Sequence, residues 1–462
     1  MTYLFDVNKF NTTFQINEKN TKAKHKTGRW FRLFPYKTTV NVDQVTSLHE
    51  LIGRYFRQLQ ECREVTVTFG TLWAEISPRV KVAPGLEDSL KKVLKDLFFD
   101  ENGEIKPTNL NLLYLLNCPK EQIEVADYLS DVLGGRTNVQ RILTKYMQEM
   151  ESQTNVLEHL LISLLRPETL EQKEHRRYFQ VTEQFNELFE SDLEFILKSA
   201  SRTRESLVDL LHLYYFTQVA QTCLQLDSFL EGNRQQCQPI YFALEWERTS
   251  RGRKCYSQGW GTLHESIKRM FTHAFVLELL NQTKEDHNVD YIALAQMISD
   301  PTEEKEITKQ VRLMCDTYRA GIDDCSEMQK LMRPNQGETS LAEEIKYLFD
   351  SVDLQFEKTF RNGPQRIYNS GFLEFCKEQF VQARGQAGSL LILSESNLIL
   401  LTKLTIKDKE KLRLNDVFKE FEKRGFFLDS KSKVISMQYF EKLNLIEKKS
   451  DSGDAQYVKR IL

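Results

Sequence analysis

Residues 398–461 read LILLTKLTIKDKEKLRLNDVFKEFEKRGFFLDSKSKVISMQYFEKLNLIEKKSDSGDAQYVKRI, and this stretch decides the fold of the end of the chain. Apolar spacing predicts a short helix at 398–404, which a charged loop at 407–411 follows. A second amphipathic helix is predicted at 414–425, where a glycine ends it. A third helix is predicted at 429–443, with Asp or Ser as its N-cap.

A β-hairpin is predicted after the third helix. Residues 445–447 run outward, the polar segment 451–454 turns, and 457–461 return. Gly453 suits the positive φ that a tight turn requires. Three helices followed by a β-hairpin in this order predict a winged-helix domain, which is a relative of the helix-turn-helix.

The third helix has two different faces. Its core side is expected to hold four apolar residues, which are Ile435, Tyr439, Phe440 and Leu443. The opposite face holds Lys431, Val434, Gln438 and Lys442. In DNA-binding helix-turn-helix proteins this outer face enters the major groove, where Gln pairs with adenine and Lys contacts guanine or phosphate. Basic residues of the hairpin are expected to contact the phosphate backbone, and these are Lys448, Lys449, Lys459 and Arg460.

The same module carries features that favour a protein partner. Val434 and Met437 place apolar groups on or beside the outer face, and Glu441 adds a negative charge. The hairpin tip holds Asp451 and Asp454, which phosphate groups repel. DNA contact, protein contact, or both within one complex therefore stay open as functions of this module.

The rest of the chain predicts a mainly α protein of three parts. Residues 1–85 are expected to form a small α+β region, with strands at 30–34 and 64–69 around a helix at 45–62. Residues 86–385 are expected to form a multi-helix body, and residues 396–462 the winged helix. Helices of the body are expected at 90–98, 168–198, 205–230, 261–281, 303–319, 340–360 and 371–384. The second and third of these predict a long antiparallel hairpin.

A loop-rich break at 232–261 interrupts the helical body and contains four basic residues, which are Arg248, Arg251, Arg253 and Lys254. Charge is also uneven along the chain: residues 396–462 contain 15 Lys and Arg against 10 Asp and Glu, whereas the whole chain carries a net charge of −3. A basic end on an acidic body is a mild indication of a polyanionic partner, and a solvated Lys-rich surface explains it equally well.

The composition also indicates where the chain works. The eight cysteines form no C-x-x-C pair, so we expect free thiols in a reducing cytoplasm and no zinc ribbon. The first residues do not resemble a signal peptide, and no apolar run is long enough to span a bilayer. We therefore expect a cytoplasmic protein that does not bind or span a membrane.

Motifs of catalysis are missing from the sequence. It has no G-x-x-x-x-G-K-[ST] loop for nucleotides, and His264-Glu265 lacks the second His of a zinc protease motif. The triplets 303–305 and 344–346 match the acidic-acidic-Lys or acidic-x-Lys patterns of nucleases, but i, i+4 charge pairing explains both. We therefore expect no enzyme activity, no cofactor and no metal, with a nuclease as the weakest alternative.

The segment 442–458, KLNLIEKKSDSGDAQYV, resembles the C-terminal end of the DptG family, and the helix at 412–425 resembles it too. This family is the G component of bacterial DNA-phosphorothioation-dependent restriction. The resemblance implies a subunit that acts with F and H components to restrict DNA lacking phosphorothioate sulfur. Because motifs of catalysis are missing, we expect a non-catalytic scaffold or DNA-contacting adaptor. It supplies no active-site residue. An autonomous winged-helix transcriptional regulator is the alternative, although nearly 400 preceding residues are many for such a protein.

Overall fold

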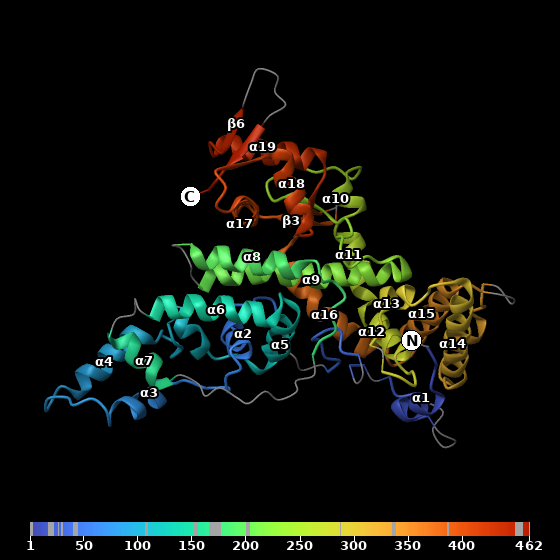
Figure 1. Ribbon diagram of the computed structural model, residues 1–462, viewed down its shortest axis with the longest axis horizontal. Coiled ribbons are helices and arrows are strands. Elements are labelled where there is room, and N and C mark those ends of the chain that lie inside the picture. Colours follow the sequence, from blue (N-terminus) through green and yellow to red (C-terminus); the bar gives the residue numbers. More distant parts are fainter. Residues whose placement is uncertain are drawn as a thin grey trace. The chain divides into compact units, whose positions relative to one another are not determined.

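A computed structural model shows a mainly helical chain (Figure 1). It describes residues 3–16, 23–25, 27–28, 31–39, 45–106, 110–151, 156–165, 177–199, 204–286, 288–334, 339–385, 388–448 and 456–461. The chain forms two compact units. The first unit consists of Met1–Gln44, Arg177–Gln184 and Thr217–Leu462, and the second of Val45–Arg176 and Phe185–Phe216. The domain boundaries expected near residues 85 and 396 stay predictions.

The described part of the second unit consists of helices joined by loops, with an isolated bridge between Phe99 and Ile105. Its elements are α2 (Ile52–Leu59), α3 (Phe69–Ile76), α4 (Glu87–Phe98), η1 (Leu110–Leu115), η2 (Lys120–Gln122), α5 (Ile123–Val132), α6 (Arg136–Glu151), α7 (Val156–Leu165), α8 (Phe185–Lys198) and the first part of α9 (Arg204–Asp227). The helix α2 packs against α5 and η1. The apolar residues that predicted this helix are all buried, namely Leu48, Leu51, Ile52, Tyr55, Phe56 and Leu59.

The expected hairpin of long helices is present as α8 and α9, although α8 begins only at Phe185. Tyr214 of α9 donates a hydrogen bond to Asp192 of α8 at 2.7 Å, and its ring packs edge-on against Phe189 at a centroid distance of 5.1 Å. These contacts give two apolar helices a shared buried face.

Both strands expected in the N-terminal region are wrong. Residues 63–68 do not pair with another strand. Thr68 instead caps α3 through a capping box, in which its hydroxyl accepts the Thr71 N–H at 3.2 Å. Residues 31–34 also form no strand, and position 30 lies outside the described residues. The alternating pattern at 64–69 arises because Val67 is buried beside exposed threonines, without a neighbouring strand. The described part of 1–85 therefore contains three helices, loops and an isolated bridge from Phe5 to Thr283, but no strand of a sheet.

The first unit is built around the buried helix α12 (Met270–Leu280), whose side chains are all buried. Such a helix, apolar on most sides, belongs in the core of a large domain. Its polar members are paired: His273 lies 2.9 Å from Asp227, and Glu278 accepts the Phe31 N–H at 3.1 Å. The other helices of the unit are α1 (Val7–Phe14), η3 (Phe229–Glu231), α10 (Lys254–Ser257), α11 (Trp260–Lys268), α13 (Tyr291–Gln296), α14 (Pro301–Ala320), η4 (Ser326–Lys330), α15 (Leu341–Lys358), α16 (Asn362–Gln379), α17 (Glu395–Ile406), α18 (Leu414–Lys423) and α19 (Ser430–Lys442).

A four-stranded sheet joins distant parts of the first unit. Its strands are β2 (Val381–Ala383), β3 (Ser389–Leu393), β1 (Tyr241–Leu244) and β5 (Phe427–Leu428), in this order. The strand β1 is parallel to both neighbours, with Ala243 opposite Ile392 and Tyr241 opposite Phe427. The predicted break at 232–261 thus contains a central strand. The helix predicted at 371–384 is wrong beyond Gln379, where β2 follows.

The end of the chain forms helices α17, α18 and α19 at the expected positions, followed by the strands β6 (Ile446–Lys448) and β7 (Gln456–Lys459). The loop expected at 407–411 is corrected at its last residue, because β4 (Lys411–Arg413) begins there and pairs with β7. The three strands form an antiparallel sheet of order β4-β7-β6. Leu412 and Ile446 both lie opposite Val458, which is fully buried.

None of the helices in the described ranges combines the length and the apolar character needed to cross a bilayer. All eight cysteines are free thiols, as the sequence predicts.

Candidate nucleic-acid or partner interface

The helix α19 is oriented by its N-cap and by small side chains. Asp429 accepts the backbone N–H groups of Lys431 and Ser432, both at 3.1 Å. Ser432, Ser436 and Phe440, spaced by four residues, are buried on one face. This face differs from the expected apolar arc of Ile435, Tyr439, Phe440 and Leu443. Ile435 and Tyr439 are only half-buried and Leu443 is 41% exposed, because serines fill the tight contact between α19 and β1.

The opposite face of α19 is exposed and carries the four residues expected there. We call Lys431, Val434, Gln438 and Lys442 the outer row. Val434 is 49% exposed, so this face also presents an apolar group to solvent. Neither lysine of the outer row forms an ion pair with another described residue. The row therefore offers two cations, an amide and an apolar group to whatever approaches it.

The hairpin contributes fewer free charges than the sequence suggested. Lys448 forms an ion pair with Glu441 at 3.0 Å, and Lys449 lies outside the described residues. Lys459 and Arg460 are exposed, but the strand register separates them from Lys448. Lys448 is opposite Gln456 at one end of the β6–β7 pairing, while the Lys459 N–H donates to Leu445 at the other end. The structure thus brings the outer row together but divides the basic residues of the hairpin.

A buried ion-pair network fixes the start of α19 to the segment after β1. The Arg253 guanidinium donates to Asp429 at 3.0 Å through Nε, to the Ser432 hydroxyl at 2.7 Å and to Glu247. Burial raises the pKa of Asp429, but the hydrogen bonds from Arg253 and the Ser432 N–H outweigh burial and hold this pKa below its ordinary value. Burial lowers the pKa of Arg253, but the hydrogen bonds to Asp429 and Glu247 and the charges of these carboxylates raise it above its ordinary value. Sequence reasoning missed this network, because its members are up to 185 residues apart.

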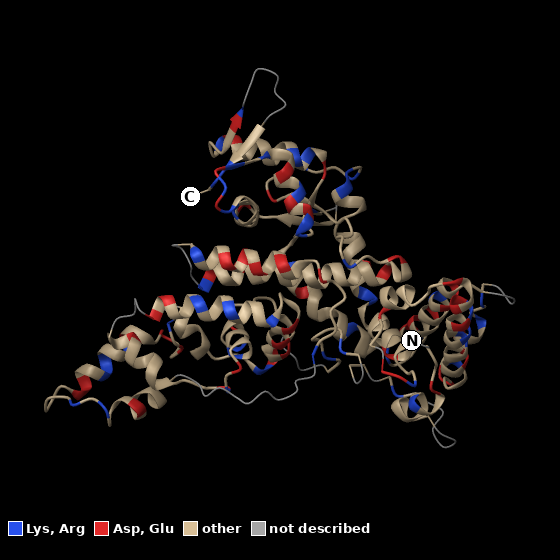
Figure 2. Cartoon of the chain, in the orientation of Figure 1, with Lys and Arg blue, Asp and Glu red and all other residues tan. Residues whose placement is uncertain are grey.

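An aromatic pair flanks the outer row. Trp246, which is 40% exposed, packs on the half-buried Tyr439 with tilted ring planes and a centroid distance of 4.8 Å. The Tyr439 hydroxyl donates to the carboxylate of Glu395, and burial together with this bond raises the pKa of Tyr439 to about 12. Figure 2 shows basic positions on α19 and in the segment that leads into α10. The site is therefore a mixed basic and aromatic surface.

The nuclease triplets have structural partners. Glu344 is buried and accepts from Arg333 at 3.1 Å, while Lys346 pairs with Asp350 at 2.7 Å. Glu303 accepts the Ser299 N–H at 2.9 Å, next to the start of α14. Within the ranges that the structure describes, no cluster of three or more His, Cys, Asp or Glu side chains is arranged to hold a metal.

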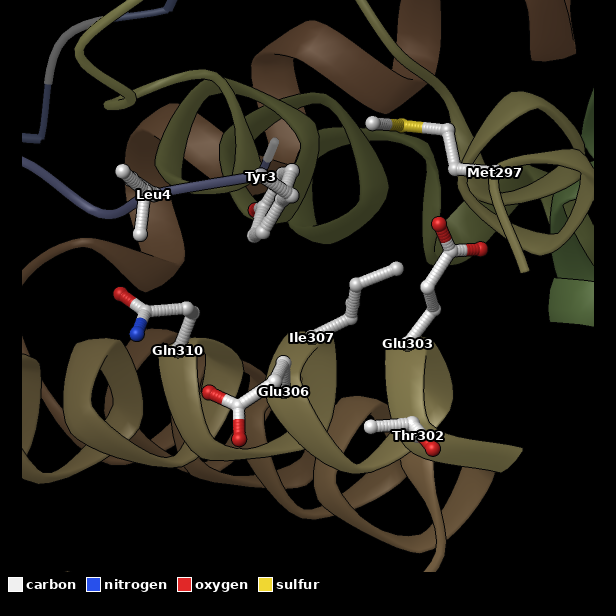
Figure 3. A pocket seen from close by; sticks show the side chains of 8 residues that line it. All are labelled: Tyr3, Leu4, Met297, Thr302, Glu303, Glu306, Ile307 and Gln310. Atoms are coloured by element: carbon white, nitrogen blue, oxygen red, sulfur yellow. The ribbon is translucent and has the colours of Figure 1, made fainter. Parts of the chain in front are cut away.

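A pocket of about 260 Å³ lies between the N-terminal segment and α14 (Figure 3). Its lining comprises Tyr3, Leu4, Met297, Thr302, Glu303, Glu306, Ile307 and Gln310. The carboxylates of Glu303 and Glu306 point in different directions in Figure 3, so they do not converge on one point. Gln310 accepts the Phe5 N–H at 3.1 Å and thereby holds the N-terminal segment. Gln310 and Glu303 of this lining thus already accept backbone N–H groups.

No protein-family model matches the chain, and no curated protein matches it.

Proposed function

We propose that this chain is a non-catalytic, cytoplasmic subunit of a bacterial DNA-phosphorothioation-dependent restriction complex, and that it contacts DNA through a C-terminal winged helix. The order α17, β4, α18, α19, β6, β7 supports the winged helix, as does the antiparallel sheet β4-β7-β6. In that arrangement α19 is the recognition helix.

The outer row of α19 is the observation that carries the DNA contact. Its four members lie at spacings of three and four residues on the face opposite the buried Ser432, Ser436 and Phe440. Lys431 and Lys442 mark the two ends of the helix, so they suit phosphate contacts on both sides of a groove. Gln438 between them suits a base edge. The exposed Val434 equally suits a protein surface, which is the competing use of this face.

The role inside a complex is supported by two further points. The tail 442–458 resembles the DptG family, whose F and H components are the partners we expect. The strand β1 also pairs with both β3 and β5, so the winged-helix region shares a sheet with the preceding part of the first unit. Because this module shares a sheet with the preceding part of the unit, it is suited to transmit contact with DNA to partners bound elsewhere on the chain.

The DNA contact is tested by measuring the affinity of the full-length chain for a fluorescent duplex. We expect the double variant Lys431→Ala, Lys442→Ala to bind more weakly, and the loss to shrink at high salt. The matched control, Lys92→Ala with Lys95→Ala, removes two exposed lysines of α4 and should bind as the wild type does. Equal affinity of all three proteins would overturn the outer row as the DNA-binding face.

The complex is tested by co-expressing a tagged chain with the F and H components. We expect all three to purify together through a salt wash. A chain that purifies alone and still binds DNA would instead favour the autonomous regulator.

A further inference from the structure

Residues 245–254, which follow β1 and end at the first residue of α10, contact α19 at two points. We call them the β1–α10 segment. Trp246 near its start packs on Tyr439, and Arg253 near its end pairs with Asp429, the N-cap of α19. Because a helix rises about 1.5 Å per residue, these two anchors are about 15 Å apart along α19. The segment is thus anchored to α19 at its N-cap and again at Tyr439, rather than at one point.

Between and beside the two anchors, the β1–α10 segment exposes basic side chains. Arg248, Arg251 and Lys254 are exposed, whereas Glu247 is buried in the Arg253 network. Glu245 is the one exposed carboxylate of this segment, whose residues are all described. The exposed charge is therefore predominantly positive on the flank of a helix that already carries Lys431 and Lys442 on its outer row.

The buried network explains how such a segment keeps its place. Arg253 is 7% exposed and joins Glu247, Asp429 and Ser432, so all the charges of the network are paired. Exposed arginines on a segment fixed in this way lose less conformational freedom on binding than they would on a free loop. The exposed Trp246 face adds an apolar edge next to them.

We infer that the β1–α10 segment is a second DNA-contacting element, whose Arg248, Arg251 and Lys254 bind phosphates beside the groove that α19 enters. This inference rests on the proposed DNA contact and adds the residues that fix the position of α19 on the duplex. Phosphate contacts of this kind set register and affinity and carry no sequence information of their own.

The test is the salt dependence of duplex binding by the full-length chain, measured by fluorescence anisotropy. The triple variant Arg248→Ala, Arg251→Ala, Lys254→Ala should reduce the slope of log affinity against log salt by about 3, since each lost phosphate contact lowers it by about 1. Its affinity at low salt should fall at least about tenfold. The charge-preserving variant Arg248→Lys, Arg251→Lys, Lys254→Arg should keep the wild-type slope.

The matched control is Lys81→Ala, Lys92→Ala, Lys95→Ala, three exposed lysines of the second unit, and it should also keep the wild-type slope. A triple variant with the slope of this control would overturn the inference, while the Lys431 and Lys442 variant still tests the outer row. No duplex binding by the wild type would overturn the proposed function itself. A slope change with duplex RNA but not with duplex DNA would overturn the assignment to DNA.

Discussion

Arg253 and Asp429 are 176 residues apart in the sequence, yet they form a two-point ion pair at the N-terminus of α19, with Nε and Nη2 donating to the two carboxylate oxygens. Asp429 also accepts two backbone N–H groups of the helix. One carboxylate therefore caps α19 and attaches it to the β1–α10 segment. We therefore expect the orientation of the outer row to depend on this pair.

Replacing Arg253 with Met should lower the free energy of unfolding by about 3–5 kcal/mol, because Glu247 and Asp429 are left buried without their cation. Urea denaturation followed by circular dichroism measures the loss. The control Arg248→Met changes an exposed arginine of the same segment and should leave stability nearly unchanged. Adding Asp429→Asn to Arg253→Met should restore part of the loss, since Asn still caps a helix. A loss below about 1 kcal/mol would show that the network does not hold α19.

Gly425 connects α18 to β5 with a φ of +83°, and a Cβ there would lie 2.7 Å from the Thr217 methyl group. Gly425→Ala should therefore cost at least about 1–2 kcal/mol from the backbone conformation alone. The control is Gly363→Ala in α16, where nothing lies within 4 Å and the helix should gain stability. Thermal melts of both variants measure the difference. Equal melting temperatures would contradict the close packing of α9 against the α18–β5 turn.

His212 should make the second unit sensitive to mild acid. It accepts the Leu48 N–H at 3.1 Å, and burial together with the charge of His49 lowers its pKa to about 4. The unfolded chain binds this proton near pH 6.5, so stability is full above that pH and falls as the pH drops toward 4. Between pH 7 and pH 5 the loss from this group should be about 2 kcal/mol.

Urea denaturation at the two pH values checks this expectation. His212→Gln keeps a hydrogen-bond acceptor but does not titrate. Between pH 7 and pH 5, the free energy of unfolding of this variant should therefore fall by about 2 kcal/mol less than that of the wild type. The control His159→Gln removes an exposed histidine of the same unit and should retain the wild-type pH dependence. Identical pH dependence in wild type and His212→Gln would count against a buried neutral imidazole.

Long helices could be predicted from the sequence because their apolar spacing repeats over several turns, as in α9. The strand β1 could not be predicted in this way. The short apolar run at 240–244 is almost entirely buried, so it shows no alternation of apolar and polar residues. The alternation at 64–69 predicted a strand wrongly, because a helix-capping segment can alternate equally well.

The candidate site was predictable in part. The outer row follows from helical spacing alone, and the structure places all four of its members on the exposed side. The prediction assigned the buried face of α19 to the wrong residues. Ser432 and Ser436 are buried on the side of β1, but serine is polar, so apolar spacing does not reveal this face. The Arg253 network depends on strand pairing between distant segments, which local sequence does not contain.

Amide hydrogen exchange of the full-length chain, with and without saturating duplex DNA, tests the central claim most directly. We expect DNA to slow exchange in peptides that cover 430–448 and 245–254, and to leave the peptides of α4 and α14 unchanged. The Lys431→Ala, Lys442→Ala variant at the same DNA concentration should lose this protection. Saturated binding with protection confined to other segments would contradict the assignment of α19 as the DNA-contacting helix.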